Sequence, residues 1–147
     1  MMMKKLLNIL RVVGGLALVT FCLSACDRSL DVESSYDFLL ETMPVPKDLA
    51  KGETAEIRCV LKRSGLFSDA RYTIRYFQPE GKGRFMLDDG TLLLPNDRYP
   101  LTKGIFRLYY TSESVESQSF DIYVEDNFGK LQQLTFSFNN KKAQEEK

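Results

Sequence analysis

Apolar and polar side chains alternate along most of this chain, and this period of two constrains the fold more than any other feature. In one segment, for example, Phe120, Ile122 and Val124 alternate with more polar neighbours. Successive side chains of a β-strand point to opposite faces of the sheet, so the pattern predicts strands with one buried and one solvated face. Such segments recur roughly every ten to fifteen residues, a spacing typical of a sandwich or a barrel.

Eight segments are predicted to be strands. They are residues 36–43, 54–63, 71–78, 84–87, 91–94, 104–111, 120–125 and 134–138. Asp88-Asp89-Gly90 predicts a hairpin with a type I′ turn, and Asp126-Asn127-Phe128-Gly129 predicts a second turn. Helical periodicity is weak, and only Asp48–Lys51 is compatible with a single helical turn. We therefore predict an all-β, immunoglobulin-like antiparallel sandwich of seven or eight strands.

The start of the chain has the layout of a secretory signal peptide. Lys4, Lys5 and Arg11 make its beginning basic, and a mostly apolar stretch follows at residues 12–22. A membrane-spanning helix needs about 20 apolar residues. Polar interruptions, and glycines at residues 14–15 that weaken helix propensity, leave the apolar stretch too short to be a spanning anchor.

The signal peptide ends in Leu23-Ser24-Ala25-Cys26, which resembles the lipobox of bacterial lipoproteins. The resemblance implies cleavage before Cys26 and a diacylglyceryl group on its thiol. An ordinary signal peptide with an incidental cysteine is the alternative, and the flanks on both sides of Cys26 argue against it. We expect a signal peptide at residues 1–25, a polar tether at 26–35, the sandwich at 36–139 and a disordered polar tail at 140–147. The initiator stays open among the three methionines at the start.

The remaining cysteine, the absence of catalytic motifs and the net charge exclude several classes of function. Once Cys22 is removed with the signal peptide and Cys26 carries lipid, Cys59 has no partner, so we predict a buried thiol and no disulfide. The sequence has no histidine, no Gly-rich phosphate loop and no metal motif, so we predict no catalytic activity and no cofactor. The full chain has 20 basic and 20 acidic residues, and 3 of the basic ones lie in residues 1–25. The rest of the chain therefore has 17 basic and 20 acidic residues and a net charge of −3, which argues against direct nucleic-acid binding.

Two tyrosines are candidate surface contacts. Tyr109 and Tyr123 are expected to point outward on neighbouring late strands, where paired aromatic rings form a platform for sugars or for a protein partner. Surface tyrosines also occur simply as cross-strand partners. A cluster of Asp and Asn around one hairpin has no calcium-loop spacing, and we interpret it as turn residues: Asp88, Asp89, Asn96 and Asp97.

Nearly the whole chain resembles the TraQ family of conjugative-transposon transfer proteins from Bacteroides-type bacteria. Besides the lipobox, the resemblance rests on Tyr72-Thr73-Ile74-Arg75-Tyr76-Phe77 with Gly81-Lys82-Gly83, on Leu108-Tyr109-Tyr110-Thr111 and on Asp126-Asn127-Phe128-Gly129. It implies an accessory envelope component in the transfer of a mobile element. The resemblance does not assign a functional role to any residue of this chain.

These observations lead to one expected function and one alternative. We expect a lipid-anchored, non-catalytic envelope protein that contacts other envelope proteins of a conjugation apparatus, with its domain in the periplasm. Asp27 after the cysteine leaves the choice between inner and outer membrane open. The alternative is a cell-surface or glycan-binding lipoprotein module, which the outward tyrosines suggest.

Overall fold

The computed structural model describes residues 1–11, 36–65 and 68–141. The chain divides into two units, Met1–Glu33 and Ser34–Lys147. Residues 2–11 are helical, and every described strand lies in the second unit. The expected cleavage site, the tether and residues 142–147 of the expected tail lie outside the described residues, so the boundaries assigned to them stay predictions.

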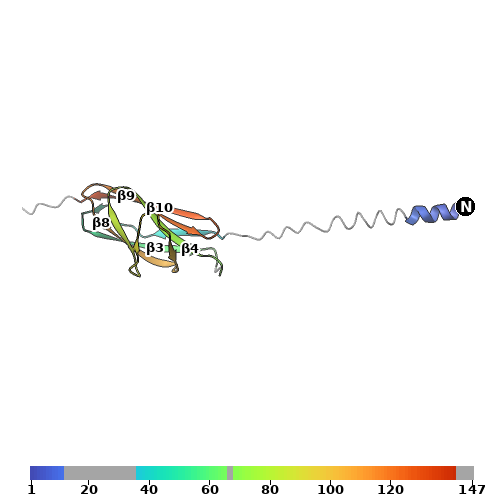
Figure 1. Cartoon of the computed structure of the whole chain (residues 1–147), viewed down its shortest axis with the longest axis horizontal. Coiled ribbons are helices and arrows are strands. Elements are labelled where there is room, and N and C mark those ends of the chain that lie inside the picture. Colours follow the sequence, from blue (N-terminus) through green and yellow to red (C-terminus); the bar gives the residue numbers. More distant parts are fainter. Residues whose placement is uncertain (12–35, 66–67, 142–147) are drawn as a thin grey trace, which may run out of the picture. The chain divides into compact units, whose positions relative to one another are not determined.

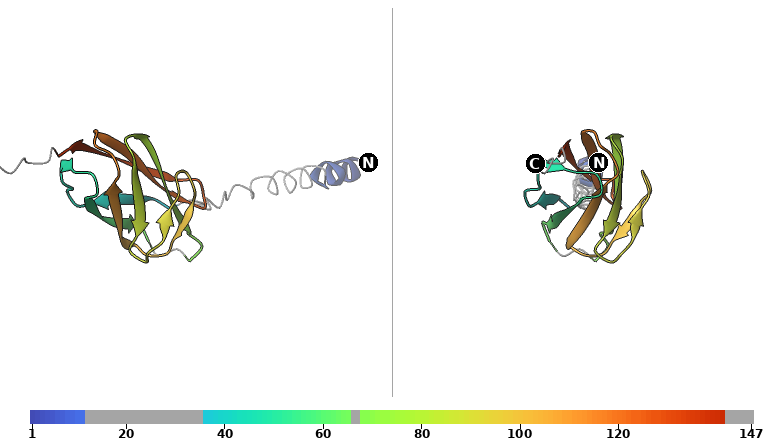
Figure 2. Two further views of the ribbon diagram at one scale, coloured as in Figure 1. Left: turned by 60° about the vertical axis from the view of Figure 1, so that its left-hand side comes forward. Right: turned by 90° about the vertical axis from the view of Figure 1, so that its left-hand side faces the viewer.

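Two five-stranded sheets form the second unit (Figure 1). The first sheet contains, in spatial order, β1 (Phe38–Thr42), β3 (Thr54–Arg63), β8 (Ile105–Ser112), β5 (Gly83–Leu87) and β6 (Leu92–Leu93). The second contains β2 (Asp48–Leu49), β10 (Leu131–Asn140), β9 (Gln118–Asp126), β4 (Tyr72–Glu80) and β7 (Tyr99–Leu101). The turned views show the cyan strand β1 and the green strand β3 in one layer, and the orange strand β9 and the red strand β10 in the other (Figure 2).

The order of the longer strands is that of an immunoglobulin fold. Neighbours β1-β3-β8-β5 correspond to strands A-B-E-D, and β4-β9-β10 correspond to C-F-G. The predicted immunoglobulin-like sandwich without a disulfide is therefore confirmed for the described part of the chain. The strand number differs, because the described residues hold ten strands, and the two unpredicted ones, β2 and β7, are short.

The segment Asp48–Lys51, which the sequence pattern left compatible with a single helical turn, is not helical. Residues Asp48–Leu49 form β2, which pairs with the end of β10 in parallel. The Asn139 N–H donates to the Lys47 carbonyl at 2.8 Å, and the Lys141 N–H donates to the Leu49 carbonyl at 3.4 Å. Leu49 is buried in the core, and β10 extends to Asn140 to reach it. Burial of one leucine and distant backbone partners thus outweigh local propensity, and the second sheet is mixed instead of purely antiparallel.

The alternation pattern does not predict β7, a strand of three residues that contains Pro100. A proline cannot donate a backbone hydrogen bond, so it is tolerated in an edge strand. β7 lies at the edge of the second sheet, where Leu101 pairs with Tyr72 of β4. The short strand buries Leu101 and completes one end of the core.

The hairpin between β5 and β6 is present, but its turn type differs from the prediction. Among the described residues outside glycine, only Asn96 has a positive φ, so Asp89 does not adopt the conformation that a type I′ turn requires. Gly90 has a φ of 87°, and its N–H donates to the Leu87 carbonyl at 3.0 Å. A type I turn followed by a left-handed glycine fits these bonds. The hairpin at Asp126–Lys130 repeats the pattern with Gly129 at a φ of 90°.

Aromatic rings from both sheets fill the centre of the core. Phe85 lies 4.7 Å from Tyr110 within the first sheet, and 4.1 Å from Tyr76 and 4.6 Å from Phe120 across the sandwich, measured between ring centroids. Aromatic contacts at such distances add about 0.5–1.5 kcal/mol each beyond their buried area. Cys59 lies on the inner face of β3 with 1% of its surface exposed, as predicted. The ring cluster therefore links the two sheets without the disulfide and the tryptophan that antibody domains have.

Candidate contact surfaces and lipid-attachment site

Cys26 lies outside the described residues, and its lipidation stays a prediction. The structure does show where the chain that follows it joins the domain. Tyr36 packs edge-on against Phe128 with 6.3 Å between ring centroids, and Lys130 forms an ion pair with Asp37. Among residues 1–11, 36–65 and 68–141, no helix is long and apolar enough to cross a bilayer.

Tyr109 and Tyr123 do not lie together. Tyr109 is on β8 in the first sheet, and Tyr123 is on β9 in the second. Each is half-buried between buried neighbours, so each ring lies on the outer face of its own sheet. The expectation of a paired platform on neighbouring strands is wrong, because β8 and β9 are consecutive in the chain but belong to opposite layers. Each tyrosine is still a separate candidate contact.

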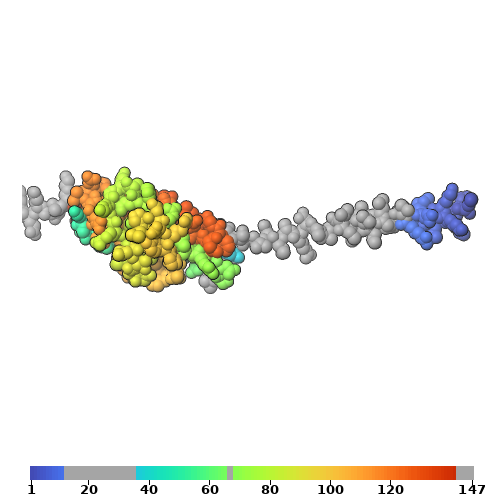
Figure 3. Space-filling view, viewed as in Figure 1, coloured from blue at the N-terminus to red at the C-terminus, as the bar shows by residue number. Residues whose placement is uncertain are grey.

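Tyr109 has apolar neighbours on one side, whereas on the other it lies opposite Glu56 of β3 and hydrogen-bonds with Arg107. In the register of the first sheet, Tyr109 lies opposite Met86 of β5, and Met86 lies opposite Leu92 of β6. Met86 is 38% exposed and Leu92 is 59% exposed. A shallow cavity of about 260 Å³ lies beside these three side chains, which we call the outer apolar row. The yellow segment that carries β5 and β6 is on the visible surface of the space-filling view (Figure 3).

The surroundings of Tyr123 are polar and already paired. The Arg75 guanidinium lies over the Tyr123 ring, 4.0 Å from its centroid. On the same face Arg98 donates to Glu125 through two nitrogens, at 2.9 and 3.2 Å. A ring that is covered by a cation offers little free surface to a sugar or a partner. The structure therefore distinguishes the two tyrosines, which the alternation pattern treated alike.

The groups that nucleophilic or metal chemistry would need are buried or serve turns. Burial raises the pKa of the Cys59 thiol from 9.0 to about 12, which disfavours the thiolate. A hydrogen bond from the Thr91 N–H lowers the pKa of Asp89, and that bond (2.9 Å) closes the turn. Asn96 holds a turn with a φ of 63°. Within the described residues no group of three potential metal ligands is present.

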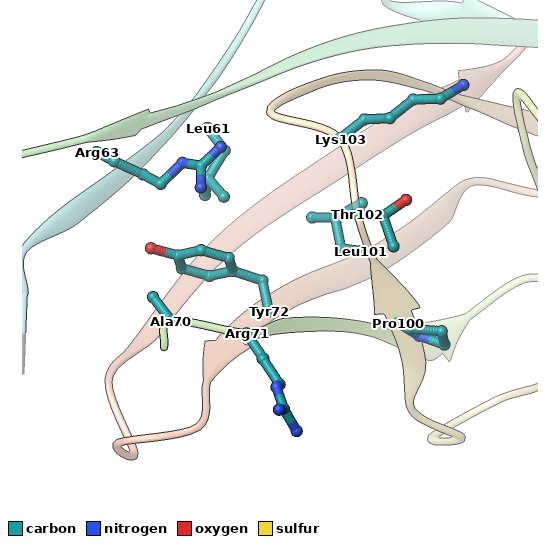
Figure 4. Close-up of a pocket in the computed structure, with 9 residues that line it drawn as sticks. All are labelled: Leu61, Arg63, Ala70, Arg71, Tyr72, Pro100, Leu101, Thr102 and Lys103. Atoms are coloured by element: carbon teal, nitrogen blue, oxygen red, sulfur yellow. The ribbon is translucent and has the colours of Figure 1, made fainter. Parts of the chain in front are cut away.

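One cavity lined by basic residues was not found from the sequence. It has a volume of about 310 Å³ and lies between the end of β3, the start of β4 and the segment after β7. Leu61, Tyr72 and Leu101 form its buried floor, and Arg63, Arg71 and Lys103 lie at its rim. Figure 4 shows the Arg63 guanidinium above the Tyr72 ring, at 5.6 Å from its centroid. Its residues come from three separate strands and the segments next to them and share no sequence spacing, so no motif could have pointed to it.

The chain is similar to a known family and to solved structures. The family model for the TraQ conjugal transfer protein matches residues 9–141. A conjugative transposon lipoprotein from Bacteroides eggerthii DSM 20697 is 54% identical, with 72% of this chain and 100% of that chain covered and a TM-score of 0.67. A lipoprotein from Bacteroides thetaiotaomicron is 58% identical over 80% of this chain and 91% of that chain, with a TM-score of 0.68.

A third solved structure is of a conjugate transposon protein (27–141) from Bacteroides vulgatus. It is 51% identical, with 81% of this chain and 97% of that chain covered and a TM-score of 0.65. No curated protein matches the chain.

Proposed function

The chain belongs to the TraQ family of conjugal transfer proteins, and from that membership we propose that it acts in conjugative transfer as a lipid-anchored, non-catalytic envelope protein that works through protein–protein contacts. The relatives from Bacteroides eggerthii and Bacteroides vulgatus are named as conjugative transposon proteins, and two of the three are named lipoproteins. These names support an envelope role for this chain.

The outer apolar row is the observation that carries the proposal. Tyr109, Met86 and Leu92 lie side by side on three adjacent strands. Met86 and Leu92 are exposed, Tyr109 is half-buried, and the charged residues Glu56 and Arg107 lie next to them. Contiguous exposed apolar groups with a polar surround are typical of interaction sites, and tyrosine is enriched among residues that dominate binding energy. The shallow cavity beside the row is suited to a protruding side chain of a partner.

Anchoring at Cys26 is the second part of the proposal. A diacyl group provides two chains, which stable membrane attachment requires. We propose that the domain extends from the membrane into the periplasm and presents the outer apolar row to another envelope component of the transfer apparatus. The proposal does not depend on which membrane holds the anchor.

A non-catalytic role is supported by the chemistry of the side chains. The sequence has no histidine, and the pKa of the buried Cys59 thiol is raised to about 12. General acid–base catalysis uses groups with pKa values close to the working pH. Neither the cavity rimmed by Arg63, Arg71 and Lys103 nor the one beside the outer apolar row is lined by a described carboxylate, histidine or cysteine.

The test measures transfer frequency. A donor strain that lacks the gene is complemented with wild type or with a Tyr109→Ala and Leu92→Ser variant. We expect the deletion to reduce transfer and the variant to fail to restore it, because truncating a central interface residue costs about 2 kcal/mol or more of binding free energy. Normal transfer in the deletion strain would refute a role in conjugation.

The matched control changes the opposite face. Tyr123→Ala with Phe77→Ser removes an aromatic ring and an exposed apolar group from the second sheet, and Phe77 is 43% exposed. This variant should restore transfer. If both variants restore it, contacts through the outer apolar row are excluded while the role in transfer still stands.

The observation that suggested the alternative, a glycan-binding module, does not hold in the structure. It depended on two outward tyrosines that form one platform, and these lie in opposite sheets. Binding of the folded domain on a glycan array, weakened by Tyr109→Ala, would restore it.

A further inference from the structure

The position where the chain joins the domain is fixed by three contacts. Tyr36 packs on Phe128, Asp37 pairs with Lys130, and Phe38 packs on Tyr72 with 5.1 Å between ring centroids. Phe38 also pairs with Arg63 across the first two strands of the first sheet. The chain therefore joins the sandwich beside the cavity whose rim carries Arg63, Arg71 and Lys103, which we call the basic pocket.

The distance from Cys26 to this end is short. A chain extends by at most about 3.3–3.6 Å per residue, so the segment of roughly ten residues up to Tyr36 spans no more than about 35 Å. With lipid on Cys26, the end of the sandwich that carries the basic pocket is the end held closest to the bilayer. This step depends on the anchoring in the proposed function.

The basic pocket is positively charged in a domain that is slightly acidic. Three of its nine lining residues are cationic and none is acidic. Arg63 and Arg71 form no ion pair with any described residue, whereas Lys103 pairs with Asp88 at 3.7 Å and also interacts electrostatically with Asp89. Because the chain beyond residue 25 has a net charge of −3, attraction to an anionic surface must come from a local site instead of the whole domain.

The three cations point in different directions. Arg63 lies over Tyr72, whereas Arg71 and Lys103 extend away from the cavity on opposite sides of its rim (Figure 4). A single enclosed anion is bound by groups that converge on it. Groups that diverge from one rim are suited to several phosphates on an extended surface. Phe128, 39% exposed on the hairpin next to the joining point, adds an apolar group at the same end.

We propose that the basic pocket is a second membrane contact, in which Arg63, Arg71 and Lys103 bind the phosphate groups of anionic phospholipids. Lipid on Cys26 keeps the protein at the membrane, and the basic pocket orients the domain on it. The sandwich then stands with its opposite end, where β10 ends, away from the bilayer.

The proposal is tested with the domain without its anchor, residues 27–147. All buried core residues lie between Phe38 and Phe138, and the solved Bacteroides vulgatus relative is a fragment numbered 27–141, so this part is expected to fold alone. Flotation is measured with vesicles of phosphatidylcholine and with vesicles that also contain phosphatidylglycerol. Since each basic residue near an anionic surface contributes about 1 kcal/mol, the triple variant R63Q/R71Q/K103Q should bind the anionic vesicles about 100-fold more weakly.

Two further variants keep the result interpretable. R58Q/R84Q/R107Q removes the same charge from the outer face of the first sheet, where Glu56 and Glu113 already pair these arginines, and it should bind like wild type. R63K/R71K keeps the charge and should also bind like wild type. Thermal unfolding of each variant checks that the exposed substitutions leave the fold intact.

Four results would overturn the proposal. They are equal binding to both vesicle types, equal loss in both triple variants, complete competition by soluble glycerol phosphate, and binding of a hexaglutamate peptide at the basic pocket without vesicle binding. The last two would assign the pocket to a free phosphate or to an acidic peptide. None of them affects anchoring at Cys26, which is measured separately on the full chain.

Discussion

The Tyr110 hydroxyl donates a hydrogen bond to Oε1 of Gln118 at 2.5 Å and connects the two sheets through the core. It also accepts a hydrogen bond from Nε2 of Gln78 at 2.7 Å. Tyr110 belongs to β8, whereas Gln118 and Gln78 belong to β9 and β4. Gln118 is 1% exposed, and its Nε2 has no partner among the described residues. This polar contact is therefore sensitive to any change at Tyr110.

Tyr110→Phe should destabilise the domain by about 1–3 kcal/mol, because it leaves the buried carboxamide of Gln118 without its remaining hydrogen bond. Urea unfolding of the domain measures the loss. Tyr109→Phe, one residue away on the outer face, should change the free energy of unfolding by no more than about 0.5 kcal/mol. Similar values for both variants would show that the contact between the sheets contributes nothing to stability.

Gly83→Ala should destabilise the domain by about 1–3 kcal/mol through steric conflict. A Cβ at Gly83 would lie 2.2 Å from Cε2 and 2.4 Å from Cζ of Tyr110. Gly104→Ala is the matched control, since its Cβ would lie 3.5 Å from the Arg63 guanidinium and 3.7 Å from the Leu61 carbonyl, both ordinary contacts. Thermal unfolding compares the two, and an unchanged melting temperature for Gly83→Ala would contradict the close packing of Gly83 on Tyr110.

Cys59 should make the stability of the domain fall at alkaline pH. Its pKa is raised by burial from 9.0 to about 12, so between these values the unfolded chain loses the thiol proton while the folded chain keeps it. The stabilising contribution is complete below pH 9 and is lost as the pH rises towards 12, by at most about 1.4 kcal/mol per pH unit.

Cys59→Ala is the comparison that isolates this effect. Between about pH 8 and about pH 10, the wild type should lose about 1 kcal/mol more than Cys59→Ala, measured by urea unfolding under reducing conditions. The tyrosines also titrate in this range, and they do so in both proteins. Rapid labelling of Cys59 by a thiol reagent in the folded state would contradict its buried position.

Cys26→Ala should release the protein from the membrane without unfolding the domain. The substitution removes the thiol that would carry the diacylglyceryl group and with it the two acyl chains. Membrane fractionation with an alkaline wash, followed by detection of the protein, measures attachment. The melting temperature of the domain should not change, because the core lies between Phe38 and Phe138. Full retention in the washed membrane fraction would refute lipid anchoring at this residue.

Much of the strand structure could be predicted from the alternation pattern. Thr54–Arg63 is a strand with the predicted bounds, and its inward side chains, Ile57, Cys59 and Leu61, are buried. A strand places alternate side chains on opposite faces, so the sequence itself records which residues face the core. The two strands that were missed, β2 and β7, have two and three residues. Segments this short contain no periodicity, and distant partners alone hold them in place.

For the candidate sites too, local features could be predicted from the sequence and features that depend on distant contacts could not. The outward orientation of Tyr109 and Tyr123 is local and was predicted correctly, whereas their separation is not local. Whether β8 and β9 become neighbours depends on pairings such as Ile57 with Leu108 and Tyr76 with Ile122, which join residues far apart in the chain. The basic pocket was missed for the same reason, because Arg63, Arg71 and Lys103 come together only at one end of the folded sandwich.

By itself the sequence determined the class of the fold, the buried position of Cys59 and the absence of histidine chemistry, because each of these depends on composition or on the local period of two. Only the tertiary structure decided which sheet each strand joins, and hence that the two tyrosines face opposite directions and that three cations share one rim. Backbone hydrogen bonds and apolar burial between distant segments select those partners. Local alternation specifies which face of a strand is buried, but it does not specify the neighbour against which that strand pairs.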